Sequence, residues 1–332
     1  MRGSRHLFDA YITAMFGRRT TEASYTRQQT TQCLSWLAGQ MVAHNQTLFY
    51  IEQMQPDWLP YRQQRAYTER VRLLSGLGVG MGVALVGGLL GGLLGGPVFG
   101  PLVGLIGGLV GGLLGGLIAD ELSAWLFERQ RGWSWNRILV AETIHWDWSS
   151  IWEWLAGLLL VGIIIGRYVV GWVGGLLAGL VSGLLVGLFV ELRRATIEPR
   201  EEIGTTMTPN QGIRRSARAA LHFGLGVGLR VGLAFVLGGE LGVGIHGGLT
   251  SGLVSGLVAG LVSGLAYGGR TVLQHYMLRW LLYRNGSLPL RLVPFLGYCV
   301  DRIFLRRVGG GYIFVHRLLL EHFAGLEQGT AE

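Results

Sequence analysis

The sequence predicts a mainly α-helical, polytopic membrane protein with about six spans in three glycine-rich hairpins, and a small module formed by its two ends. Half of the 332 residues are hydrophobic and 14% are charged, a composition too apolar for a soluble domain of this size. Three long blocks nearly lack charge, and glycines recur in them at a spacing of four. These features favour helices that pack closely inside a bilayer.

The three apolar blocks are residues 73–119, 154–190 and 219–268. About 20 helical residues cross a hydrocarbon core about 30 Å thick, so each block is too long for one crossing. We therefore expect each block to be a helical hairpin.

The predicted turns follow from proline and glycine. Pro97 and Pro101 interrupt the backbone hydrogen bonds of the first block. The second block is expected to turn near residues 171–175, and the third near residues 238–240.

The arginines predict the orientation. All basic residues are arginine, and apart from Arg167 and Arg230 they lie outside the blocks. The segments that carry them are 1–72, 120–153, 191–218 and 269–332. Hairpins return the chain to one side, so these segments share a side, which the positive-inside rule makes cytoplasmic. We expect a bacterial inner-membrane protein with both termini in the cytoplasm and only short turns on the far side.

This gives the following organisation: a cytoplasmic helical segment (1–72), hairpin 1 (73–119), a Trp-rich interfacial linker (120–153), hairpin 2 (154–190), a cytoplasmic linker (191–218), hairpin 3 (219–268) and a C-terminal cytoplasmic segment (269–332).

Glycines at a spacing of four predict where helices pack. They are Gly171, Gly175, Gly179, Gly183 and Gly187 in the second block, and Gly244, Gly248, Gly252, Gly256, Gly260, Gly264 and Gly268 in the third. Small residues at this spacing let helix backbones approach in lipid, although glycine costs about 1 kcal/mol per residue in an ordinary soluble helix. The main interpretation is packing within one chain. The alternative is closure of a homo-oligomeric ring around a pore.

Two further features concern the membrane. Six tryptophans within residues 133–154 suit a helix lying in the headgroup layer, with an aromatic ligand cage as the alternative. Arg230 lies in the middle of a span, where a charge usually faces the bundle interior. Glu240 and His246 are its candidate partners, and snorkelling to the interface is the alternative.

The two ends predict short soluble elements. Apolar residues at helical spacing within 7–59, including Leu34, Leu37 and Met41 and then Leu48 and Ile51, predict a helical layer. Near the C-terminus we expect a helix closed by Asn285–Gly286, a helix with Pro294 in its first turn, a small β-hairpin at the triple glycine, and a last helix.

The N-terminal stretch "CLSWLAGQMVAHNQTLFYIEQMQPDWL" resembles the helical segment that follows the nucleotide-binding core in bacterial NACHT proteins of the STAND NTPase class. The stretch "VPFLGYCVDRIFLRRVGGGYIFVHRLLLEHFA" is similar to their winged-helix-like region, with the motif residues Phe314, His316, Arg317, Glu321 and Phe323. The resemblance implies a winged-helix-like module in which His316 lies near nucleotide phosphates. The alternative is a histidine packed against its own domain.

This sequence departs from the family pattern because the NTPase core is missing. The chain has no lysine, so it cannot contain the phosphate-binding loop GxxxxGK[ST]. We therefore expect no enzymatic activity and no bound cofactor. His316 and His322 do not have the spacing of a zinc motif, and the dispersed arginines do not favour nucleic-acid binding.

The sequence thus predicts the membrane-anchoring and signal-coupling portion of a STAND/NACHT-type switch. Its expected partners are membrane lipid and an NTPase-bearing chain. The alternatives are an autonomous oligomeric pore or channel, a small-molecule transporter, which spans so poor in polar groups disfavour, and a functionless remnant.

Overall fold

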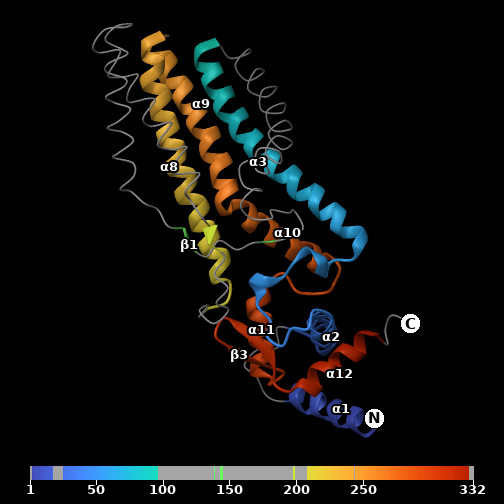
Figure 1. Cartoon of the computed structure of the whole chain (residues 1–332). Coiled ribbons are helices and arrows are strands. Elements are labelled where there is room, and N and C mark those ends of the chain that lie inside the picture. Colours follow the sequence, from blue (N-terminus) through green and yellow to red (C-terminus); the bar gives the residue numbers. More distant parts are fainter. Residues whose placement is uncertain are drawn as a thin grey trace.

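The computed structural model describes residues 2–17, 25–95, 138, 143–144, 197–198, 208–242 and 244–328. These residues form a mainly helical structure, as the sequence predicts. Figure 1 shows long helices side by side and, at their lower end, a cluster of shorter elements that holds both termini.

The cluster, called the terminal module here, comprises α1 (Arg2–Gly17), α2 (Arg27–Ala43), the 3-10 turns η1 (Ile51–Gln53) and η2 (Pro56–Trp58), α11 (Leu292–Asp301), strands β3 (Leu305–Val308) and β4 (Gly311–Phe314), and α12 (Arg317–Gln328). The long apolar helices are α3 (Tyr61–Gly95), α8 (Gln211–Gly242) and α9 (Gly244–Gly264). A π-helical turn, Leu265–Gly269, joins α9 to α10 (Arg270–Arg284), and the short strands β1 (Thr143–Ile144) and β2 (Ile197–Glu198) pair antiparallel.

Local signals set the ends of several elements. Thr26 and Gln29 form a capping box at the start of α2, in which each side chain accepts a hydrogen bond of 3.2 Å from the other's backbone N–H. Asn285 and Gly286 close α10 as predicted, with Gly286 at φ 71°. The predicted glycine hairpin is confirmed, with Gly309 at φ 59° in the turn between β3 and β4.

Both ends of the chain contribute to one core. The backbone of Phe49 pairs with that of Tyr312 through hydrogen bonds of 2.7 and 2.8 Å, which adds an N-terminal residue to the edge of β4. The Arg302 guanidinium donates to the carbonyl oxygen of Phe16 at 2.6 Å. The large side chains that fill the core come from both ends: Leu34, Leu37, Met41, Phe49, Phe295, Phe304 and Phe323. The terminal segments therefore form one folded unit.

The helices α8 and α9 form an antiparallel hairpin, and α3 packs along α9 (Figure 1). The stretches Gln211–Val236 and Gly252–Arg284 are long and apolar enough to cross a membrane. Only 17% and 28% of their most apolar windows are buried inside the protein. Because the core helix of a soluble protein is mostly buried, this exposure favours helices that face lipid.

The structure differs from two local predictions. The turn of the third block, expected near residues 238–240, comes slightly later, because α8 continues to Gly242 and α9 begins at Gly244. Glycine keeps the N–H that proline lacks, so residues 238–239 can remain helical. The N-terminal helical layer is interrupted, because α2 ends at Ala43 and Phe49 is paired with β4, so Leu48 lies in the non-helical segment between them.

Other predictions fall largely outside the described residues. These are the turn at Pro97 and Pro101, the second hairpin (154–190) and most of the Trp-rich linker (120–153). Within that linker, Thr143–Ile144 is a strand where a helix was expected. Its pairing with Ile197–Glu198 brings the linkers 120–153 and 191–218 together.

Candidate functional site: the joint between the terminal module and the apolar helices

The glycines of α9 face those of α8 at backbone contact. A methyl group placed on Gly256 would lie 2.6 Å from the carbonyl oxygen of Gly228, and one on Gly260 would lie 2.7 Å from that of Gly224. A methyl group on Gly232 would lie 3.0 Å from the carbonyl oxygen of Gly252. Side chains do not fit at such distances, so the two helices need glycine to pack as they do.

The leucines of these helices are exposed, in contrast to the closely packed glycines. On α8, Leu221, Leu225, Leu229 and Leu233 recur at a spacing of four and are exposed, with Leu229 at 72%. Leu249 and Leu253 on α9 and Leu73 and Leu77 on α3 are exposed as well. Contiguous exposed apolar surface of this kind marks a face that contacts lipid or another protein.

Arg230 lies on α8 between these leucines and is half-buried. It interacts with other residues of the chain. The side chains of Glu240 and His246, its predicted partners, lie outside the described part of the structure.

A kink separates α9 from α10 at the last glycine of the stripe. Gly268 has φ 138°, which L-residues with a side chain rarely adopt, and a side chain there would collide with the backbone of Ser216 on α8. The buried ring of Tyr267 stacks on Phe223 with centroids 4.3 Å apart. The kink is therefore fixed against the base of α8, and α10 leaves at an angle toward the module (Figure 1).

The joint is the region where α10, the kink before it and the first residues of α3 and α8 meet the terminal module. Polar contacts there bring together all four arginine-bearing segments, which are 1–72, 120–153, 191–218 and 269–332. The Gln55 side chain exchanges two hydrogen bonds with the backbone of Ile138, at 3.1 and 2.8 Å, so the 120–153 linker is attached to the N-terminal segment. Arg279 of α10 donates a hydrogen bond to the Asn210 side chain, which attaches the 191–218 linker to the C-terminal segment. The joint therefore collects segments that the sequence places on one side of the membrane.

The joint also contains a buried histidine. His275 on α10 is fully buried beside the backbone of Glu52, and neither of its ring nitrogens makes a hydrogen bond of good geometry with the described residues.

The residues of the NACHT-like motif have structural roles within the module. Phe314 and Phe323 are buried, with ring centroids 5.9 Å apart. Arg317 and Glu321 form an exposed pair at 3.1 Å, one turn apart on α12. His316 is exposed and caps α12, because its Nδ1 accepts the backbone N–H of Leu318 at 3.1 Å.

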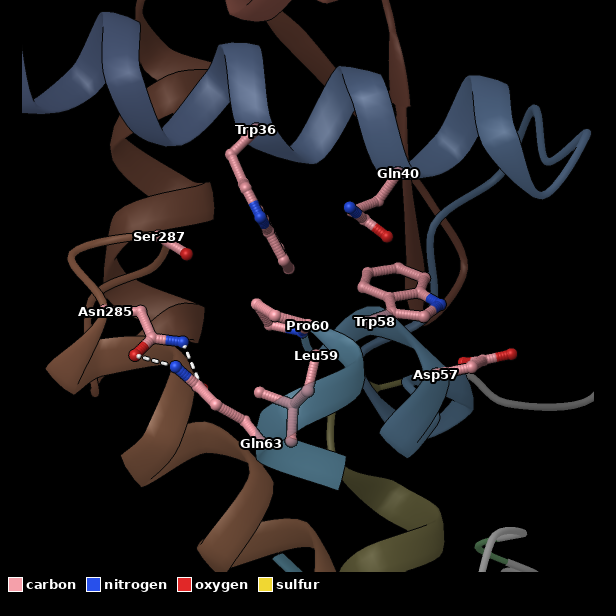
Figure 2. Close-up of a pocket in the computed structure, with 9 residues that line it drawn as sticks. All are labelled: Trp36, Gln40, Asp57, Trp58, Leu59, Pro60, Gln63, Asn285 and Ser287. Atoms are coloured by element: carbon pink, nitrogen blue, oxygen red, sulfur yellow. Dashed lines mark hydrogen bonds between the residues drawn. The ribbon is translucent and has the colours of Figure 1, made fainter. Parts of the chain in front are cut away.

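A groove runs between α2, η2 and the adjoining ends of α3 and α10 (Figure 2). Its volume is about 610 Å³, and its lining residues are Trp36, Gln40, Asp57, Trp58, Leu59, Pro60, Gln63, Asn285 and Ser287. The amides of Gln63 and Asn285 exchange hydrogen bonds of 3.1 and 2.7 Å across its base. This pair ties the start of α3 to the end of α10. Asp57 is the ionisable residue of the lining, and its Oδ2 atom lies 3.5 Å from Nε2 of His44.

The structure brings together only part of the predicted site. Gly252, Gly256, Gly260 and Gly264 share one contact surface, while Gly268 lies at the kink and His316 lies in the module. Residues 171–187 lie outside the described part. Sequence reasoning missed Gly224, Gly228 and Gly232, although their spacing of four is a usable signal. Within the described residues, no three His, Cys, Asp or Glu side chains are grouped as metal ligands.

Comparison with protein-family models, with curated proteins and with solved structures finds no match to this chain.

Proposed function

We propose that the chain is a membrane-anchored coupling protein, in which the terminal module acts on a bundle of glycine-packed spans. More particularly, we propose that it is the membrane-anchoring and signal-coupling portion of a STAND/NACHT-type nucleotide switch. It would have no NTPase activity of its own and would receive its signal from an NTPase-bearing partner.

One observation carries the coupling proposal: two helices run from the module into the apolar bundle. The helix α3 is continuous for 35 residues from the groove of the module to its contact with α9. On the return path, α9 continues through the kink into α10, which ends at the same groove. A rearrangement of the module would therefore shift α3 and α10, and with them the spans.

The membrane part of the proposal rests on lengths and exposure. The 21 residues of α9 measure about 32 Å, which matches a hydrocarbon core of about 30 Å. The arginines Arg214, Arg215 and Arg218 lie in the first turns of α8, directly before its exposed leucines. Contacts of all four arginine-bearing segments at one end favour a bacterial inner-membrane protein of about six spans with cytoplasmic termini.

The module's helix–hairpin–helix arrangement supports the winged-helix part of the proposal. The order α11, β3, β4 and α12 corresponds to that expected for the NACHT-like C-terminal region. Because His316 is exposed at the start of α12, its ring is accessible to a nucleotide held by a partner chain.

A partner-binding experiment tests the coupling proposal. The full chain is purified from membranes in detergent, and the eluate is searched for a protein that contains GxxxxGK[ST]. We expect such a protein to be present, and we expect ATP and ADP to retain different amounts of it. A His316→Ala variant should lose the difference, with exposed Arg306→Ala as the control. Absence of such a protein from a correctly inserted chain contradicts the proposal.

The pore alternative makes a different prediction. Gly252, Gly256, Gly260 and Gly264 of α9 contact α8 of the same chain and so are not available to pack a neighbouring chain. We therefore expect no leakage from liposomes that contain the purified chain. Leakage that a Gly252→Leu, Gly256→Leu variant abolishes would favour the pore.

A further inference from the structure

Arginine and aromatic side chains meet at the level where the apolar surface of α3 begins. The Trp280 ring on α10 is 38% exposed. Two guanidinium groups lie over it: the Cζ atom of Arg70 on α3 is 5.6 Å from the ring centroid, and that of Arg284 is 5.2 Å away. This cluster, called the Arg–Trp clamp here, joins residues that are far apart in the sequence.

The position of the clamp relative to the apolar surface follows from α3. Leu73, the first exposed leucine of the apolar block, lies three residues after Arg70, which is about 4.5 Å along the helix. On α10, Tyr276 and Tyr283 are exposed on either side of Trp280. Tryptophan, tyrosine and arginine are the side chains enriched at the headgroup level of membrane proteins.

Among the described residues, no ion pair balances the charges of the clamp. Within the described part of the chain, neither Arg70 nor Arg284 forms an ion pair, and neighbouring Glu69 is exposed without one. Two like charges near one ring repel each other. An anion bound to either guanidinium would reduce the repulsion, and a guanidinium binds a phosphate through two parallel hydrogen bonds.

We propose that the Arg–Trp clamp binds the phosphate of an anionic phospholipid headgroup on the cytoplasmic side of the bilayer. The proposal rests on the membrane anchoring proposed above and adds a lipid preference to it. Because α3 and α10 are the helices that link the module to the spans, a bound lipid would hold the joint at the membrane surface.

The experiment uses the full chain in phosphatidylcholine nanodiscs with increasing phosphatidylglycerol. A fluorophore on Tyr283→Cys reports the nearby lipid, through quenching by brominated phosphatidylglycerol or brominated phosphatidylcholine. The native cysteines are buried and should not take the label. We expect stronger quenching by the anionic lipid. An arginine near an anionic surface contributes about 1 kcal/mol, so Arg70→Gln and Arg284→Gln should each lower the preference about fivefold.

The control variants Arg62→Gln and Arg306→Gln each remove the same charge at an exposed position outside the clamp and should keep the preference. Equal quenching by both lipids in the unmodified protein overturns the proposal, as does an equal loss in the control. Displacement of the lipid by 10 mM sodium phosphate, but not by chloride of equal ionic strength, would identify a soluble-anion site instead. A chain that does not enter nanodiscs contradicts the membrane anchoring itself.

Discussion

The terminal module and the α8–α9 pair place their large side chains in opposite ways. In the module, large side chains such as Phe295, Phe304 and Phe323 fill the core. In the α8–α9 pair, glycines occupy the contact and leucines such as Leu229 point outward. The first arrangement is stabilised by removing apolar surface from water, and the second by close contact of helix backbones. The module is therefore packed as expected in water, and the α8–α9 pair as expected for the membrane spans proposed above.

The largest expected effect tests the water-facing half of this comparison. Phe323 is fully buried against Phe304 and Phe314, so Phe323→Ala leaves a cavity and should lower the free energy of unfolding of the module by about 3–5 kcal/mol. The measurement is thiol labelling of buried Cys33 at increasing urea concentration. Leu318→Ala on the exposed side of α12 should change the free energy of unfolding by less than about 0.5 kcal/mol. Equal effects of the two changes would mean that α12 is not packed as described.

The second prediction compares the same substitution in both regions. Leu229 on α8 and Leu318 on α12 are both exposed, at 72% and 51%. Leu229→Asp should oppose membrane insertion by about 3 kcal/mol, because an aspartate at the centre of a span loses its hydration. Leu318→Asp should be nearly neutral, because its side chain remains in water. The measurement is the fraction of each variant in the membrane pellet. If Leu229→Asp were tolerated as well as Leu318→Asp, α8 would be facing water.

Sequence patterns identified the elements whose signals are local. The Asn285–Gly286 helix end and the glycine hairpin depend on neighbours along the chain, and the predicted elements formed there. Phe49 becomes extended because Tyr312 offers backbone hydrogen bonds, a partner that periodicity cannot reveal.

The candidate site shows the same limit. Glycine spacing predicted a packing face on α9, but the partner face of α8 follows only from the antiparallel hairpin. The Arg–Trp clamp joins α3 and α10, whose residues are separated by most of the chain. Gly268 was interpreted as a further packing glycine because it continues the spacing of four, whereas its positive φ is a tertiary property of the kink.

The third prediction concerns the glycine contact itself. Gly256→Leu places a side chain against the backbone of Gly228 and should destabilise the hairpin by about 1–3 kcal/mol. The measurement is the mole fraction of sodium dodecyl sulfate at which half of the protein unfolds in mixed micelles. Gly78→Leu is the matched control, because Gly78 lies on α3 with open space around it. A loss of similar size at Gly78 would contradict a specific backbone contact.

The fourth prediction concerns the stability of the module at alkaline pH. The buried thiols should not change this stability at neutral pH. Burial raises the pKa of the Cys33 thiol from 9.0 to about 11, and the pKa of Cys299 is raised well above its usual value, mainly by burial. Above pH 9, the unfolded state releases protons that the folded module retains. The contribution of these thiols to the free energy of unfolding should therefore be constant below pH 9 and should fall as the pH rises toward 11.

The glycine contact between α8 and α9 has no titrating side chain, so alkaline pH should separate the two regions. After a wash of membranes at pH 11, we expect the chain to stay in the pellet while protease cuts the terminal module. At pH 8, the module should resist the same protease. Release of the chain at pH 11 would show that the apolar helices depend on the module instead of on the bilayer. Full protease resistance at pH 11 would show that the buried thiols do not limit the stability of the module.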